Sequence, residues 1–161
     1  MMNLNFARAN PKATRDAEIK LYGADAFAAM RKAGRLAAEA LDMLVPHVKP
    51  GVTTQFLDDL VFQFAMDSKA LPATLNYRGY TKSICTSINH VVCHGIPNNK
   101  PLREADIVNI DVTLIVDGWH GDSSRMYRVG EVSRRAERLI EVTYEALKRG
   151  VEASVVTSMG R

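Results

Sequence analysis

The dipeptide Asp117-Gly118 stands between two stretches of alternating character, and it constrains the fold more than any other feature of the chain. Asp-Gly is typical of two-residue β-hairpin loops, because both loop positions need positive φ. The stretch 107–116 alternates well, and 119–129 follows as the returning strand. With this loop, counting back along both strands places Thr113 opposite Asp122. The sequence therefore predicts a long antiparallel hairpin in one defined register.

The predicted hairpin has one apolar face and one polar face. The apolar face carries Val108, Ile110, Val112, Leu114 and Val116, and the polar face carries Asn109, Asp111, Thr113, His120, Asp122 and Ser124. Asp111 and Asp122 are then diagonal neighbours across the two strands, roughly 7–8 Å apart at the backbone. Two such carboxylates repel unless a cation or a shared proton intervenes. Their oxygens suit divalent metal ions, and a bridging pair could hold two ions about 3.5–4 Å apart. The alternative is the polar outer face of a half-solvated antiparallel sheet.

Helical periodicity surrounds the hairpin on both sides. A first helix is predicted from Ala24 to Val45, with Pro46 ending it, and a second helix follows Thr53 or Thr54 as its cap and runs to about Ser68. The apolar face of the first helix comprises Phe27, Met30, Ala33, Ala37, Leu41 and Leu44, and that of the second comprises Phe56, Leu57, Leu60, Val61 and Phe64.

The remaining elements complete an α+β class. A strand is predicted over 82–89, followed by Val91-Val92, and a last helix runs from a cap at Ser133 to Arg149, with Gly150 as its stop. We therefore expect helices packed on one face of a mainly antiparallel sheet.

Composition excludes several classes of protein. The chain has 161 residues, of which 47% are hydrophobic, so it can build the core of one domain. Its 21 basic and 18 acidic residues are mixed, which gives little support for nucleic-acid binding. Two cysteines make no disulfide framework and suit a reducing cytosol. The polar N-terminus lacks the apolar core of a signal peptide, and no apolar run reaches the ~18 residues of a membrane span. A cytoplasmic protein is predicted.

Several residues upstream of the hairpin have chemistry of their own. His94 begins a Gly/Pro turn, where its imidazole is able to donate a hydrogen bond or carry a proton near neutral pH; the alternative is a surface-loop histidine. Tyr77 and Tyr80 are able to form the wall of an apolar pocket, or to pack as ordinary aromatic residues. Cys85 fits either a pocket or the core.

Three strings carry a resemblance to a known family. They are Thr86–Pro97 (TSINHVVCHGIP), Asp106–Thr113 (DIVNIDVT) and Asp117–Asp122 (DGWHGD). In order and spacing they resemble type I methionine aminopeptidases, which have the pita-bread fold, and the similarity runs from about Ile19 to Gly150. The resemblance implies a flexible lead-in over 1–17, the N-terminal half of the family's catalytic domain over 18–150, and a divergent tail over 151–161.

The resemblance also implies a role for each matching residue. Asp111 matches a terminal ligand and Asp122 a bridging ligand of two divalent metal ions, which in this family are cobalt, manganese, iron, nickel or zinc. His94 matches the histidine that contacts the scissile peptide. Positions that line the methionine pocket match Tyr77, Tyr80 and Cys85, and backbone groups of a structural monovalent-cation site match Asn89 and Val91. The implied reaction removes the initiator methionine from nascent chains near the ribosome, by attack of a metal-bound hydroxide.

The family also requires a later histidine and two later glutamates, one of them the general base. The histidines here are His47, His90, His94 and His120, and none follows. We therefore expect a truncation or frameshift after the last helix, and weak metal binding and catalysis in this chain. The alternatives are a non-catalytic binding module of the same fold and a relative of the proline dipeptidases.

Overall fold

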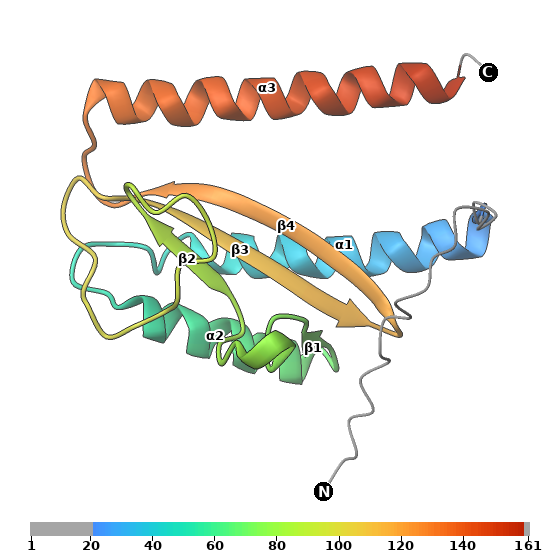
Figure 1. Cartoon of the computed structure of the whole chain (residues 1–161), viewed down its shortest axis with the longest axis horizontal. Coiled ribbons are helices and arrows are strands. Elements are labelled where there is room, and N and C mark those ends of the chain that lie inside the picture. The colour runs from blue at the N-terminus through green and yellow to red at the C-terminus, as the bar shows by residue number, and fades with distance from the viewer. Residues whose placement is uncertain (1–20, 160–161) are drawn as a thin grey trace, which may run out of the picture.

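The computed structural model describes residues 21–159, with side chains as far as Ser154, and this region forms three helices and a four-stranded antiparallel sheet (Figure 1). The elements are α1 (Ala24–Leu44), α2 (Thr54–Asp67), β1 (Leu71–Pro72), a 3-10 turn (Tyr77–Gly79), β2 (Cys85–Ile88), β3 (Ile107–Val116), β4 (Trp119–Arg128) and α3 (Arg134–Met159). The predicted α+β class is confirmed. The lead-in predicted over 1–17 lies outside the described residues.

Strand β3 is the centre of the sheet. It pairs with β4 along its whole length on one side, and with β2 and β1 on the other side. Asp117 and Gly118 have φ angles of 51° and 84°, as a two-residue loop of this kind requires. Thr113 lies opposite Asp122, so the predicted register is confirmed.

Helix α1 packs on the apolar face of the hairpin. A Cβ atom at Gly121 would lie 2.1 Å from the carbonyl oxygen of Ala33, so only glycine lets β4 approach the helix this closely. The predicted helix face is buried from Ala33 onward, but Phe27 and Met30 are 60% and 45% exposed. The reason is visible in Figure 1, where the N-terminal end of α1 extends past the tip of the hairpin.

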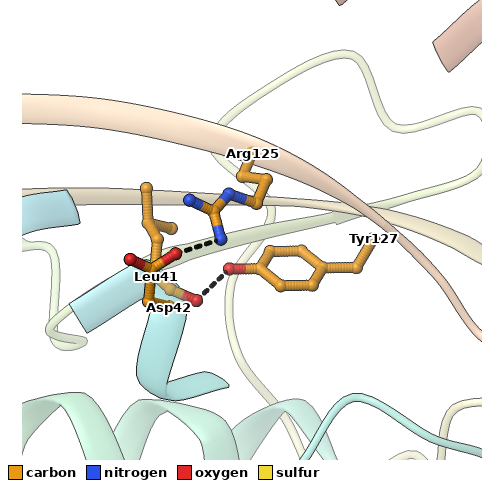
Figure 2. A network of polar contacts seen from close by, with 4 residues as sticks. All are labelled: Leu41, Asp42, Arg125 and Tyr127. Atoms are coloured by element: carbon orange, nitrogen blue, oxygen red, sulfur yellow. Dashed lines mark hydrogen bonds and ion pairs between the residues drawn. The ribbon is translucent and has the colours of Figure 1, made fainter. Parts of the chain in front are cut away.

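Two polar contacts fix the C-terminal end of α1 to β4 (Figure 2). Arg125 Nη1 donates to Asp42 Oδ1 at 2.7 Å, and the hydroxyl of Tyr127 donates to the carbonyl oxygen of Leu41 at 2.6 Å. Burial raises the pKa of Tyr127 to about 12, which keeps this hydroxyl protonated as a donor. The second contact is buried, and it satisfies a carbonyl near the end of the helix.

Strand β2 is shorter than the strand predicted over 82–89. The amides of Ser83 and Ile84 donate to Asp58 Oδ1 in α2, at 2.7 and 3.1 Å, instead of continuing the ladder. The predicted continuation through Val91-Val92 is wrong, since Asn89 takes a φ of 53° and leads the chain into a loop.

Helix α3 stands apart from the other elements (Figure 1). Ser133 caps it as predicted, its Oγ accepting from the amide of Ala136 at 3.3 Å, and Arg128 forms ion pairs with Glu137 and Glu141. The stop predicted at Gly150 is wrong, because the helix continues to Met159; glycine weakens a helix, but ends one only when it turns left-handed. The prediction that helices pack on one face of the sheet is therefore confirmed for α1, whereas α3 does not pack on the sheet. Within residues 21–159, no helix is both long and apolar enough to cross a membrane.

Candidate active site

A pocket of about 660 Å³ opens on the polar face of the hairpin, on the side away from α1. It is bounded by β3, β4, the start of β2, the loop before β2 and the turn after it. The described residues that line it are Ala73, Thr74, Tyr77, Arg78, Gly79, Tyr80, Thr81, Cys85, His94, Ile96, Asp111, Thr113, His120 and Asp122. All six residues predicted for catalysis, substrate or metal are among them.

The two aspartates lie on a common face, as the predicted register requires. Burial raises the pKa of Asp111, and the neighbouring charge of Asp122 raises it further, while His94 opposes both effects. The hydroxyl of Thr113 donates to Asp122 Oδ1 at 2.9 Å and so orients that carboxylate. The pocket floor is therefore a paired carboxylate site that favours a bound proton or a cation.

The turn that carries His94 is held against β2 by close backbone contact. The amide of Thr86 donates to the carbonyl oxygen of Gly95 at 2.7 Å, and the amide of Gly95 donates to Ser87 Oγ at 3.2 Å. A Cβ atom at Gly95 would lie 2.1 Å from the Thr86 carbonyl oxygen, so glycine is required. His94 itself has a φ of 54°, a strained conformation that this contact maintains.

Tyr80 joins three parts of the pocket. Its hydroxyl lies 2.9 Å from the carbonyl oxygen of Ile84 and 3.2 Å from that of Gly95, so one proton is shared between the start of β2 and the His94 turn. Burial raises the pKa of Tyr80, and burial likewise raises that of the Cys85 thiol. Both groups are therefore neutral near pH 7, which suits a wall for an apolar side chain.

Other predicted residues lie elsewhere, and some lining residues were not predicted. Asn89 and Val91 do not line the pocket; the Asn89 carboxamide instead donates to Asp106 and accepts from the Ile107 amide. Arg78 was missed, although its place between two tyrosines predicted for the pocket wall was a signal.

The two aspartates meet part of the needs of a metal ion. Carboxylate oxygens suit divalent metals, so Asp111 and Asp122 fit as part of a metal site. In the region that the structure describes, no three His, Cys, Asp or Glu side chains are grouped to hold an ion. Catalytic zinc sites use three protein ligands, so the two aspartates alone fall short of one.

Comparison with known proteins gives consistent results. Residues 28–158 match metallopeptidase family M24. A methionine aminopeptidase of Rickettsia prowazekii is 60% identical over 134 residues, covering 83% of this chain and 52% of that protein. Its crystal structure superposes with a TM-score of 0.81, covering 83% of this chain and 54% of that one.

More distant structures agree on the fold. A methionine aminopeptidase from Thermotoga maritima is 34% identical with a TM-score of 0.79, covering 82% of this chain and 53% of that one. An Xaa-Pro dipeptidase from Bacillus anthracis, 21% identical with a TM-score of 0.69 and coverage of 80% and 35%, shares the fold alone. The chain spans about half the length of the curated relatives it matches. The structure has the pita-bread fold of these enzymes, and the chain belongs to metallopeptidase family M24.

Proposed function

We propose that this chain carries the methionine-binding side of a type I methionine aminopeptidase, which removes the initiator methionine from nascent proteins. The observation that supports this most directly is the convergence of Asp111, Asp122, His94 and the tyrosine wall on one pocket, in a chain 60% identical to a methionine aminopeptidase. Relatives named for proline-specific cleavage are much less similar. The expected substrates are peptides that begin with Met, and the expected setting is the cytoplasm near the ribosome.

The proposed metal ligands are the two carboxylates of the pocket floor. Asp111 would be a terminal ligand, and Asp122, oriented by Thr113, would bridge two divalent ions; cobalt, manganese, iron, nickel and zinc are the candidates. When bound, such ions polarise the peptide carbonyl and lower the pKa of a water molecule. In the proposed assignment the two carboxylates supply negative charge that balances the ions. The same negative charge attracts the amino group of the substrate.

The proposed roles of the other residues concern binding and proton position. His94 is held by the Gly95 contact with its side chain at the pocket, where an imidazole N–H is able to donate to the scissile carbonyl oxygen. Tyr77, Tyr80 and Cys85 would accept the methionine side chain, whose thioether makes favourable contacts with aromatic rings. The neutral Cys85 thiol adds no charge to this apolar wall.

We further propose that the 161 residues by themselves are a poor catalyst. Two carboxylates bind divalent ions weakly, and no third His, Cys, Asp or Glu side chain is grouped with them in the described part of the chain. The same observation favours a second candidate function, in which the chain binds Met-initiated peptides without cleaving them.

Peptide hydrolysis separates the two functions. The purified chain is mixed with a Met-Ala-X peptide and cobalt(II) or manganese(II), and free methionine is measured beside an Asp122→Asn control. We expect turnover close to that of the control, together with peptide binding by calorimetry. Turnover well above the control would refute the ligand argument. Absence of any preference for Met-initiated peptides over Gly-initiated ones would refute the proposed function itself.

A further inference from the structure

The loop between β1 and β2 carries a cation to the rim of the pocket. Its base is fixed beside β3, because the amide of Ala73 donates to the Thr113 carbonyl oxygen at 2.8 Å and Thr74 Oγ1 donates to the Lys82 carbonyl oxygen at 2.9 Å. Arg78 lies about midway between these anchors in the sequence, in the 3-10 turn Tyr77–Gly79, and it lines the pocket.

This turn is held in a specific conformation. The amide of Asn76 donates to the Tyr80 carbonyl oxygen at 2.7 Å, which closes the turn. Arg78 has φ 48° and ψ 33°, a left-handed conformation that costs energy for a residue with a Cβ atom. Its guanidinium carbon lies 5.4 Å from the centre of the Tyr77 ring, within the range of a cation–π contact. The aromatic wall therefore orients the charge.

Arg78 is unusual among the pocket residues in its charge. It is the only Lys or Arg among the described lining residues, whereas Asp111 and Asp122 form an acidic floor. The ion pairs found within residues 21–159 do not include Arg78, so its guanidinium keeps its donors available for an external anion. The pocket thus has negative charge at its floor and positive charge at its rim.

We propose that Arg78 binds a carboxylate of the peptide substrate on the far side of the scissile bond, so that the site prefers peptides with negative charge there. This assignment rests on the proposed aminopeptidase function. A substrate whose amino group is held at the acidic floor runs outward by about 10 Å over three residues. In this proposal its third side chain, or the terminal carboxylate of a short peptide, pairs with Arg78, which lines the same pocket as the two aspartates. Guanidinium suits this task because its planar fork pairs with carboxylate oxygens in bidentate geometry.

The proposal is tested by measuring the binding of three peptides by calorimetry, with manganese(II) present. Met-Ala-Gln-amide has no negative charge. Met-Ala-Glu-amide has one negative charge on its third side chain, and Met-Ala-Gln with a free C-terminus has one on its terminal carboxylate. Mass spectrometry verifies that each peptide stays intact. The variants are Arg78→Gln and Arg78→Lys, and the matched control is Arg31→Gln, which removes one exposed positive charge on α1, remote from the pocket lining.

We expect the chain to bind at least one acidic peptide about two- to fivefold more tightly than the neutral one, as for an exposed ion pair. This preference should fall to about onefold in Arg78→Gln, persist in Arg31→Gln, survive in part in Arg78→Lys, and weaken at high salt. Equal binding of all three peptides, or an unchanged preference in Arg78→Gln, overturns the Arg78 assignment while leaving methionine recognition intact. If no Met-initiated peptide binds, the proposed function and this assignment fail together.

Discussion

Asp58 provides a sharp test of how the pocket wall is held in place. Asp58 is 5% exposed, and its Oδ1 accepts hydrogen bonds from the backbone amides of Ser83 and Ile84. These two residues are themselves only 2% and 0% exposed. Those two residues lead directly into β2 and so set the position of Cys85. Replacing Asp58 with Ala leaves two buried donors without an acceptor. Each orphaned donor costs about 1–3 kcal/mol, and partial access of water reduces the sum, so we expect a loss of roughly 2–4 kcal/mol.

The matched variant is Asp58→Asn, which keeps an oxygen able to accept both bonds and removes the buried charge. We expect it to cost less than about 1 kcal/mol. Burial raises the pKa of Asp58, so the native state holds the proton more tightly than the unfolded state. This contribution to stability is complete below the unfolded value of 3.8 and is lost as pH rises through the raised native value. Asp58→Asn lacks that loss, and its stability relative to the parent should improve from pH 3 to pH 7.

Urea unfolding followed by circular dichroism measures both effects. For a domain of this size, the loss in Asp58→Ala corresponds to a melting temperature lower by roughly 4–16 °C. Equal stability of the Ala and Asn variants would show that the two amide bonds contribute nothing, and would refute the reasoning. If the difference in stability between Asp58→Asn and the parent were the same at every pH, the claim that burial raises the pKa of Asp58 would be contradicted.

Three further variants test other contacts. Tyr127→Phe should lose about 1–2 kcal/mol, because the carbonyl of Leu41 loses its donor. The parent should also weaken from pH 10 towards pH 12 relative to this variant, because burial raises the Tyr127 pKa from 10.0 to about 12; parallel curves would contradict this. Gly95→Ala should lose at least about 2 kcal/mol and abolish peptide binding, since its Cβ atom would meet the Thr86 carbonyl oxygen at 2.1 Å; normal binding would mean that the turn yields. Gly150→Ala should gain about 0.5–1 kcal/mol, because it lies inside α3 with open space around it; destabilisation would indicate a helix stop.

The hairpin and its register were predictable because the information is local. Asp117-Gly118 specifies a two-residue loop, and once that loop is known, each cross-strand pair follows from counting. The shared face of Asp111 and Asp122 is therefore a consequence of a single turn. The place of His94 is different, since it depends on the approach of Gly95 to Thr86, and the resemblance to a family located it where periodicity did not.

Periodicity identifies the apolar face of a helix but not the surface that covers it. Phe27 and Met30 belong to the predicted face of α1, yet they are largely exposed, because the N-terminal end of this helix extends past the tip of the hairpin (Figure 1). Leu139 and Leu147 of α3 are likewise 59% and 60% exposed. Arg78 was missed for a similar reason, because its position depends on a left-handed turn, which leaves no repeating pattern in the sequence.

The contacts between α1 and β4 set the order in which this region is able to fold during translation. Asp42 meets Arg125, 83 residues later, and Leu41 meets Tyr127, 86 residues later. At about 5–20 residues per second, the ribosome needs roughly 4–17 seconds to make the intervening chain. For that length of time the alanine and leucine stripe of α1 exists without the strand that will cover it. Among the described helices, α1 is therefore made before α2 and α3, yet its C-terminal end completes its contacts only when β4 arrives.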